Sequence, residues 1–239
     1  MGRAAKGAFA CEDPLTYLPR TAVQEFTKGS AIYDSQHPSE NLYVVILGRV
    51  KITTTSEDGS QTVARIVANE GLFGESALLG LSKRPSSAVA LDDVTVMAWS
   101  RGDLEKQIEL EPRLGVALSQ YLARVSLELQ DRIVSMAVHK TPERVMLALL
   151  HLAGTLGTPN PDGSARVASL THQTIAEYVG TSREVVTFQM NRLRRMGLLR
   201  YSRKTIDIYP RALEETLQQH AVSLPPDPGQ PQQASGTAD

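Results

Sequence analysis

The chain has 239 residues, with 25 Lys and Arg against 26 Asp and Glu, so its formal net charge is −1. This balance excludes a uniformly basic coat, and any surface for nucleic acid must be local. The single cysteine, Cys11, excludes an intrachain disulfide and a cysteine-ligated zinc or iron–sulfur site. Because no apolar run approaches the roughly 20 residues of a membrane helix and the N-terminus lacks the apolar region of a secretory signal, we expect a cytoplasmic protein of two domains without a membrane partner.

The first domain is expected over residues 23–111, after an N-terminal extension of residues 1–22. Short apolar runs alternate with turn signals between residues 31 and 100, which is typical of a small antiparallel β domain without helices. Glycines in the segments 47–49 and 56–60 supply the positive φ that hairpins need. The predicted strands are 42–45, 50–54, 62–67, 88–90 and 94–99.

One long helix is predicted over residues 112–139, because apolar residues recur there at intervals of three and four with charges between them. The narrow apolar stripe advances by roughly 3.5 residues per step, as in a coiled coil, which favours a symmetric two-helix dimer interface. The alternative is a helix that packs on its own β domain. The predicted dimer seam consists of Leu118, Leu122, Val125, Leu129, Ile133 and Met136.

A second domain is expected over residues 140–218. The segment Thr141–Glu143 supplies an N-cap, a first-turn proline and an early acid, which predict a helix through Leu152. The Gly- and Pro-rich residues 154–163 are expected to end that helix, and residues 165–168 to form a strand.

Residues 170–199 predict two helices joined by a tight turn. Thr171 caps the first helix, Gly180 ends it, and Ser182 caps the second. The glycine at the turn and the small Ala176 allow the helices to cross closely. The expected buried residues are Ile175, Ala176, Val179, Val185, Val186, Met190 and Leu193.

The second of these helices has the features of one that enters the major groove of DNA, with the residues near its N-terminus facing base edges. Arg183 can donate to guanine and Glu184 can accept from cytosine, so the pair favours a half-site that contains a G·C base pair. Phe188 can contact a thymine methyl group or the backbone. The predicted base-reading residues are Arg183, Glu184, Thr187 and Phe188.

Local charge supports this interpretation. Between residues 140 and 212 there are 11 basic and 5 acidic residues, an excess that reverses the sign of the whole chain. Strand signals at 198–201 and 205–209 complete a winged helix-turn-helix. The predicted phosphate contacts, which position the protein on DNA, are Thr171, Gln173, Ser182, Arg192, Arg194, Arg195, Arg203 and Lys204.

Two motifs carry a resemblance to a known family. The segment Gly-Thr-Ser-Arg-Glu at 180–184, followed by Val-Val, resembles the recognition segment of the CRP/FNR superfamily of bacterial transcription regulators, and Phe-Gly-Glu-Ser-Ala-Leu-Leu at 73–79 with Ser-Ser-Ala-Val at 86–89 resembles its effector cassette. The resemblance covers roughly residues 23–218. It implies an α+β fold, with an antiparallel β-roll, a long dimerisation helix and a C-terminal winged helix-turn-helix.

The resemblance also implies an effector pocket. Relatives that bind cyclic nucleotide use a Gly-Glu pair and an arginine just before Ser-Ala, but here Ser86 stands at the arginine position and Arg84 lies two residues earlier. Leu129 occupies a position where cAMP-binding relatives place a small hydroxyl residue. A cyclic nucleotide, another ligand and no ligand therefore stay open. The implied pocket consists of Gly74, Glu75, Ser76, Arg84, Ser86, Ser87, Leu129 and Gln130.

Other function classes lack their motifs. No nucleophile elbow, P-loop or metal-ligand helix is present, so we expect no enzyme, and none of the five histidines (His37, His139, His151, His172 and His220) has the spacing of a haem or metal ligand. The alternatives are a nucleotide-binding regulatory module without specific DNA readout and a nonspecific architectural protein. The expected partners are duplex DNA, a second copy of the chain and RNA polymerase. Residues 219–239 are predicted to be a disordered tail.

Overall fold

The computed structural model describes residues 11–222. The chain forms two compact units. Of these residues, one unit contains 11–148 together with Leu170–Gln189, and the other contains Leu149–Ser169 and residues 190–222.

The first unit holds two four-stranded sheets, and all strand pairs in both are antiparallel. One sheet has the order β1 (Val23–Phe26), β8 (Val94–Ser100), β3 (Asn41–Leu47), β6 (Leu72–Phe73). The other has the order β2 (Ala31–Tyr33), β7 (Ser87–Ala90), β4 (Val50–Thr55), β5 (Gln61–Val67). The sheets form the β-roll that the sequence predicted, and each predicted strand lies within or overlaps one of β3, β4, β5, β7 and β8.

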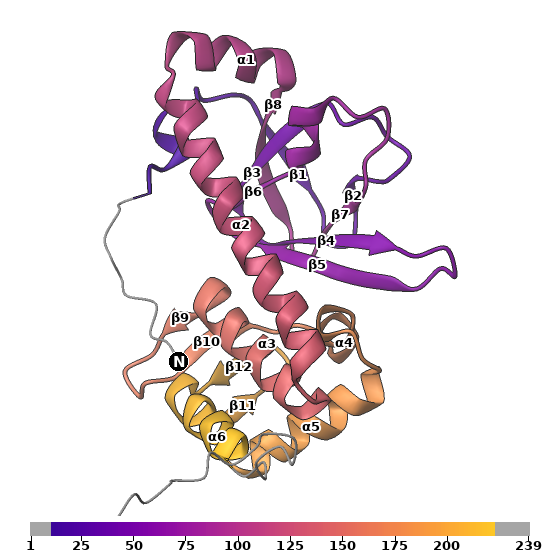
Figure 1. Ribbon diagram of the computed structural model, residues 1–239, viewed down its shortest axis with the longest axis vertical. Helices are drawn as coiled ribbons and strands as arrows, with labels where there is room; N and C mark the ends of the chain where they lie inside the picture. Colours follow the sequence, from indigo (N-terminus) through magenta and orange to yellow (C-terminus); the bar gives the residue numbers. More distant parts are fainter. Residues whose placement is uncertain (1–10, 223–239) are drawn as a thin grey trace, which may run out of the picture. The chain divides into compact units, whose positions relative to one another are not determined.

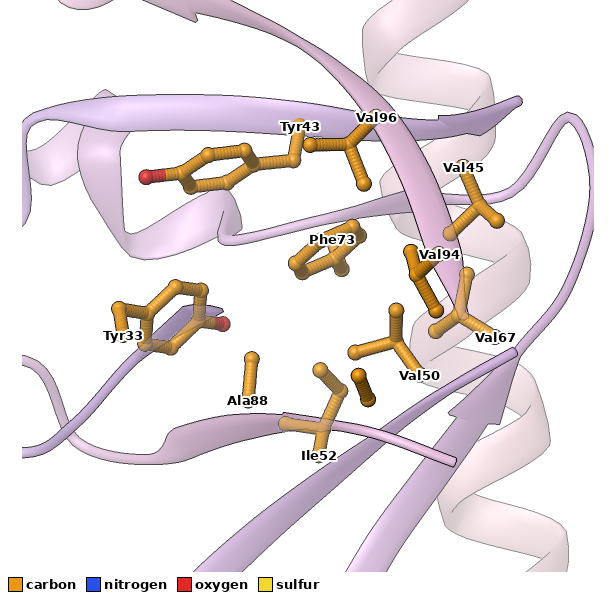
Figure 2. Packing of buried hydrophobic residues seen from close by; sticks show 11 residues of the cluster. Tyr33, Tyr43, Val45, Val50, Ile52, Val67, Phe73, Ala88, Val94 and Val96 are labelled. Atoms are coloured by element: carbon orange, nitrogen blue, oxygen red, sulfur yellow. The ribbon is translucent and has the colours of Figure 1, made fainter. Parts of the chain in front are cut away.

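A hydrophobic core fills the β-roll between its two sheets. Most of the valines lie at one end of this cluster, and the rings of Tyr33, Tyr43 and Phe73 lie toward the other end (Figure 2). The ring centroids of Tyr43 and Phe73 lie 5.1 Å apart in a stacked pair. Aromatic side chains therefore form the wall of the β-roll nearest the effector cassette.

The expectation of no helix between residues 31 and 100 is wrong at one place. The segment η2 (Glu75–Leu79) forms a short 3-10 helix directly after Gly74, whose φ is 82°. A β-carbon at Gly74 would lie 2.9 Å from the carbonyl oxygen of Asn41. Glycine is required here because both the left-handed backbone and the close approach exclude a side chain.

Two helices follow the β-roll. Helix α1 (Arg101–Leu110) begins with a capping box, in which the Ser100 side chain accepts from the backbone of Asp103 and the Asp103 side chain accepts in return. Helix α2 (Arg113–Val138) matches the predicted long helix and runs past β3 and β6 (Figure 1). The 3-10 turn η1 (Pro14–Thr16) precedes β1.

Part of the predicted dimer seam is buried inside the chain itself. Leu118 and Val125 join a second core with Leu42 and Leu72 of the β-roll, so their assignment to an intersubunit seam is corrected. The N-terminal half of α2 thus packs on its own β domain, as the alternative interpretation had it. The seam residues that stay exposed are Leu122, Leu129, Ile133 and Met136.

The rest of the chain forms helices and a small antiparallel sheet of the order β11-β12-β10-β9. Helix α3 ends four residues after Leu152, the predicted end of the helix, and includes Gly154. The loop that was predicted to begin at Gly154 therefore begins after Leu156. The elements are α3 (Thr141–Leu156), β9 (Thr158–Pro159), β10 (Ala165–Ala168), α4 (His172–Val179), α5 (Arg183–Arg195), β11 (Leu199–Tyr201), β12 (Thr205–Ile208) and α6 (Pro210–Val222).

The predicted tail began at residue 219, whereas α6 continues to Val222. The helical residues 219–222 follow on from the preceding turns of α6, which is anchored by the fully buried Leu213. The remainder of the predicted tail lies outside the described residues, as do the first ten residues of the predicted N-terminal extension.

Candidate functional site

The turn between α4 and α5 is built from the local signals that the sequence predicted. The Thr171 side chain accepts a hydrogen bond from the backbone N–H of Thr174 at 3.0 Å, and Gly180 closes α4 with a φ of 73°. The Ser182 hydroxyl accepts from the backbone N–H of Val185 at 3.3 Å. The two caps and the left-handed glycine fix where α5 begins.

Apolar packing holds the two helices. Ile175, Val186 and Met190 are fully buried, and Leu193 is nearly so. Val185 is only half-buried, which corrects the expectation that it lies inside. The buried set therefore leaves the opposite face of α5 free to carry polar residues.

The predicted base-reading residues divide into two groups. Arg183, Glu184 and Phe188 are exposed at the start of α5, and Phe188 retains 60% of its accessible surface. Thr187 is half-buried; its hydroxyl donates to the carbonyl oxygen of Arg183 at 2.8 Å and is also 2.9 Å from Nδ1 of His172. The hydroxyl of Thr187 thus has partners inside the motif, and the three exposed side chains are the ones open to a base.

Two titratable groups lie in the same region. Hydrogen bonds from its own backbone and from the Ser182 side chain hold the pKa of Glu184 below its ordinary value, which keeps the carboxylate charged. Burial, and secondarily the charge of Arg183, lower the pKa of His172, so that the imidazole is neutral near pH 7.

The predicted phosphate contacts are also unequal. Arg194, Arg195, Arg203 and Lys204 are exposed, while Arg192 is half-buried. Two of the polar candidates are already engaged, since Thr171 caps α4 and the side-chain amide of Gln173 donates to Glu177 at 2.9 Å. The strongest candidates are therefore the exposed cations.

The hairpin β11–β12 carries two of these cations at its tip. Ser202 donates its backbone N–H to the carbonyl oxygen of Thr205 at 2.8 Å, which closes the turn that presents Arg203 and Lys204. The Tyr201 hydroxyl donates to the side-chain oxygen of Asn191 at 2.9 Å and so ties the hairpin to the C-terminal half of α5. This is the wing that the sequence predicted.

The predicted effector residues of the β-roll lie in two places. Gly74, Glu75, Ser76, Arg84 and Ser86 lie in the cassette between β6 and β7, and Ser87 is the first residue of β7. Leu129 and Gln130 lie on α2 and line neither of the two pockets described for this chain. Of the eight predicted effector residues, only Arg84 lines one of these two pockets.

Two residues that the sequence analysis did not single out, Arg65 and Tyr121, contact the cassette or the strand before it. Glu75 forms an ion pair with Arg65 of β5, and Arg65 donates to the Tyr121 hydroxyl at 2.8 Å. The same hydroxyl donates to the carbonyl oxygen of Leu72 at 2.6 Å. An arginine inside the otherwise apolar run 63–67 was the available signal, because such a position needs a partner.

Arg84 lies two residues before Ser86, the position at which the family pattern has an arginine. Its guanidinium lies 3.9 Å from the centroid of the Tyr33 ring and donates from Nη2 to the carbonyl oxygen of Asn41 at 2.9 Å. Burial raises the pKa of Tyr33 to about 12, against a lowering by Arg84 and by a hydrogen bond with Ser86. The phenol stays neutral at any physiological pH.

Within residues 11–222 no cluster of three His, Cys, Asp or Glu side chains could hold a metal ion. His37 lies 2.7 Å from Asp34, and His139 lies 3.3 Å from Glu143. None of the helices in this described part is long and apolar enough to span a membrane.

Family models match most of the chain. The model of the cyclic nucleotide-binding domain matches residues 23–111, and the model of the Crp-like helix-turn-helix domain matches residues 143–216. The match thus includes both the β-roll cassette and the α4–α5 turn.

Curated relatives are similar over most of their length. The CRP-like cAMP-activated global transcriptional regulator of Mycobacterium tuberculosis strain H37Rv is 30% identical over 183 residues, which are 76% of this chain and 81% of the relative. The global nitrogen regulator of Synechococcus elongatus is 29% identical over 196 residues, which are 81% of this chain and 88% of the relative.

Solved structures share the architecture. A CRP/FNR-family transcriptional regulator from Thermus thermophilus superposes with a TM-score of 0.67 at 28% identity, covering 82% of this chain and 98% of that one. FixK2 from Bradyrhizobium japonicum gives a TM-score of 0.71 at 22% identity, covering 81% and 96%, and shows the same fold.

Proposed function

Since the chain belongs to the CRP/FNR family of transcription regulators, we propose that it acts as a dimer on a palindromic DNA operator, with two copies of α5 in successive major grooves. The observation that carries this proposal is the exposed N-terminal face of α5, where Arg183, Glu184 and Phe188 have no part in the apolar packing. Side chains at this end of a recognition helix reach base edges.

The proposed roles follow from chemistry and exposure. Arg183 reads guanine through paired donors, Glu184 accepts from cytosine, and Phe188 contacts a thymine methyl group. Arg194 and the wing cations Arg203 and Lys204 bind phosphates and set the register without selecting a sequence. Arg192 and Arg195 add charge to the same end of α5.

The proposed dimer interface is the C-terminal half of α2. Leu129 and Ile133 there are 37% and 66% exposed in the single chain, whereas residues of the N-terminal half pack on the β-roll. An apolar stripe left in water on a helix is the surface that a second copy covers in a coiled coil. We propose domain boundaries that follow this division of roles. The β-roll spans residues 23–111, the dimerisation helix residues 112–139 and the DNA-binding domain residues 140–218.

The matched β-roll model implies a cyclic nucleotide, and the side chains of the cassette do not fit one. Glu75, the residue that would hold the ribose, is engaged by Arg65, and Ser86 supplies no cation for the phosphodiester. We therefore propose that operator binding does not require cAMP. RNA polymerase is the proposed further partner at a promoter.

Selection from a random duplex pool tests the DNA-binding proposal. We expect a palindrome whose half-site centres lie about one helical turn apart. Arg183→Ala should relax the preference at one base pair at a cost of about 1–3 kcal/mol, while Arg194→Ala should weaken all sequences alike and lower the salt dependence.

Arg101→Ala on α1 is the matched control, because it removes an exposed arginine outside the helix-turn-helix. It should leave both affinity and selectivity unchanged. Equal losses on all sequences for Arg183→Ala and Arg194→Ala would contradict the assigned roles, and the absence of any selected sequence would contradict the function.

A further inference from the structure

The turn that precedes α5 is held by two arginines from other helices of the first compact unit. Nη2 of Arg132 on α2 donates to the carbonyl oxygen of Tyr178 at 2.8 Å, and Nη2 of Arg144 on α3 donates to that of Gly180 at 3.0 Å. Both acceptors lie at the C-terminal end of α4, where the last carbonyl groups of a helix have no partner within the helix. A cation at this end also complements the helix dipole.

Arg132 is bound to the β-roll as well. Its Nη1 donates to the carbonyl oxygen of Ala64, and its Nη2 donates to that of Val63 at 3.1 Å. Both carbonyl groups belong to β5, the edge strand of its sheet. Consecutive residues of β4 pair with Arg65 and then with Val63, so Ala64 is the extra residue of a β-bulge. The guanidinium of Arg132 therefore joins a bulge on a sheet edge to the end of α4.

The partners of Arg132 are backbone groups rather than acids. Among the ion pairs of residues 11–222, none includes Arg132. Its guanidinium lies 4.3 Å from the centroid of the Tyr178 ring. Because its three acceptors are main-chain oxygens, Arg132 fixes the backbone of β5 relative to that of α4.

Two further contacts join α4 to the same part of the chain. Lys51 of β4 forms an ion pair with Glu177 of α4 at 3.3 Å, and the two side chains are only 18% and 13% exposed. A β-carbon at Gly180 would lie 3.8 Å from Cε of Met136 on α2, so the glycine of the turn lies against that helix. Residues outside the helix-turn-helix motif thus determine where α4 ends.

We propose that Arg132 is a positioning residue for the reading of DNA. By holding the C-terminal end of α4 against β5, it fixes the direction in which α5 presents its base-reading side chains, and Arg144 holds the same turn at Gly180. The proposal rests on the proposed function of α5. Ser182, the cap of α5, follows Gly180 by two residues, so little chain separates the held carbonyl group from the helix. A turn that is ordered before binding loses less entropy on the operator.

The positioning role has a specific consequence for DNA binding. Hydrogen bonds to base edges require an exact placement of α5, whereas attraction to phosphates depends mainly on charge. Loss of the Arg132 contacts should therefore weaken binding to the operator and leave binding to unrelated DNA nearly unchanged.

Affinities for a selected operator and for a scrambled duplex of the same length, at one salt concentration, test the proposal. We expect Arg132→Met to lower the ratio of the two affinities by about tenfold, because hydrogen bonds from a charged group are lost. Arg132→Lys keeps the charge without the planar fork and should recover part of the ratio. Arg144→Met removes one hydrogen bond and should lower the ratio by a smaller factor.

Arg124→Met is the matched control. Arg124 is an exposed arginine of the same helix, and its guanidinium lies 5.2 Å from the centroid of the Tyr121 ring. This variant loses the same charge as Arg132→Met and should keep the wild-type ratio.

A purely structural role gives a different result. A smaller folded fraction lowers the measured affinity for both duplexes by the same factor, so the ratio stays constant. Arg132→Lys and Arg144→Met carry the same test if Arg132→Met does not fold. An unchanged or raised ratio in the folded Arg132 and Arg144 variants would overturn the proposal.

Hydrogen exchange without DNA tests the held turn independently of the proposed function. We expect the amides of residues 178–186 to exchange at least about tenfold faster in Arg132→Met than in wild type, and at the wild-type rate in Arg124→Met. Unchanged exchange in Arg132→Met would overturn the proposal. Faster exchange in a chain whose wild type selects no DNA sequence would keep the contact and remove the proposed function, whereas selective DNA binding with a constant ratio would remove the positioning role alone.

Discussion

The arginines of α5 and those of the β-roll meet different surroundings. Arg183 and Arg194 are exposed on α5, whereas Arg49 and Arg84 are buried in the β-roll and Arg65 is half-buried. The exposed pair has water as its main partner until another molecule arrives. The β-roll arginines have carboxylate, phenol, carbonyl or ring partners from distant parts of the chain.

This difference separates function from stability. An exposed cation is worth little to the folded state, so α5 can present several of them to a polyanion. A cation inside the β-roll affects the free energy of unfolding through its partners, and each one must be satisfied within the fold or by a ligand. Substitutions of arginine should therefore have opposite consequences in the two regions.

The largest expected effect is that of Arg65→Met. It leaves Glu75 and the Tyr121 hydroxyl without their common donor, at an expected cost of about 2 kcal/mol in the free energy of unfolding. This is below the roughly 3–5 kcal/mol of a fully buried pair because the two side chains are 19% and 27% exposed. Urea unfolding of the purified chain gives the value.

Arg194→Met is the matched control for this substitution. Arg194 is exposed and contacts the face of Tyr201, at 5.1 Å, so the change should stay within about 0.5 kcal/mol. If the two variants were equally stable, the contrast between the regions would be lost. Arg65→Met combined with Glu75→Gln should recover part of the stability, since no unpaired carboxylate remains.

A smaller effect is expected for Gly180→Ala in the turn between α4 and α5. The glycine has a φ of 73°, and a β-carbon there would meet only Cε of Met136 at 3.8 Å, an ordinary contact. The cost is therefore conformational, about 1–2 kcal/mol.

Gly154→Ala makes the same chemical change as Gly180→Ala but should change the free energy of unfolding in the opposite direction. Gly154 lies inside α3, and a β-carbon there has nothing within 4 Å, so alanine should stabilise the chain by about 0.5–1 kcal/mol. Thermal unfolding of both variants measures the difference. Destabilisation of similar size in both would show that the turn has no special conformational demand.

The smallest effect is expected from pH, through His172 in the helix-turn-helix. Its pKa in the folded chain is lowered from the ordinary value of 6.5, chiefly by burial. The unfolded chain therefore binds the proton more readily. The contribution of His172 to the free energy of unfolding is fully present above the ordinary pKa of 6.5 and is lost as pH falls toward the lower pKa of the folded chain. Comparison of urea midpoints for wild type and His172→Gln at about pH 8 and about pH 5.5 isolates this contribution. A wild-type loss no larger than that of His172→Gln would contradict it.

Local signals were sufficient for the helix-turn-helix. Thr171, Gly180 and Ser182 fix the ends of two helices through contacts within a few residues, and the period of the apolar residues identifies the buried face. Five strands of the β-roll (β3, β4, β5, β7 and β8) and the wing were predictable for the same reason, since alternation and turn residues act over short distances. The short strands β1, β2 and β6 were not predicted. The charged face of α5 followed from these, because what is not buried must be exposed.

Long-range pairing decided what the sequence left open. The periodicity of the sequence predicted an apolar stripe on α2 but not the surface against which the stripe packs. Only the fold placed Leu118 and Val125 against the β-roll and left Ile133 exposed to water. The hydrogen bond from Arg65 to Tyr121 joins residues 56 positions apart, and nothing local indicates such a partner. The environment of Arg84 likewise depends on β2, β3 and the cassette meeting in space. A sequence specifies the period and the ends of its elements, whereas the burial of a charge depends on which elements pack together.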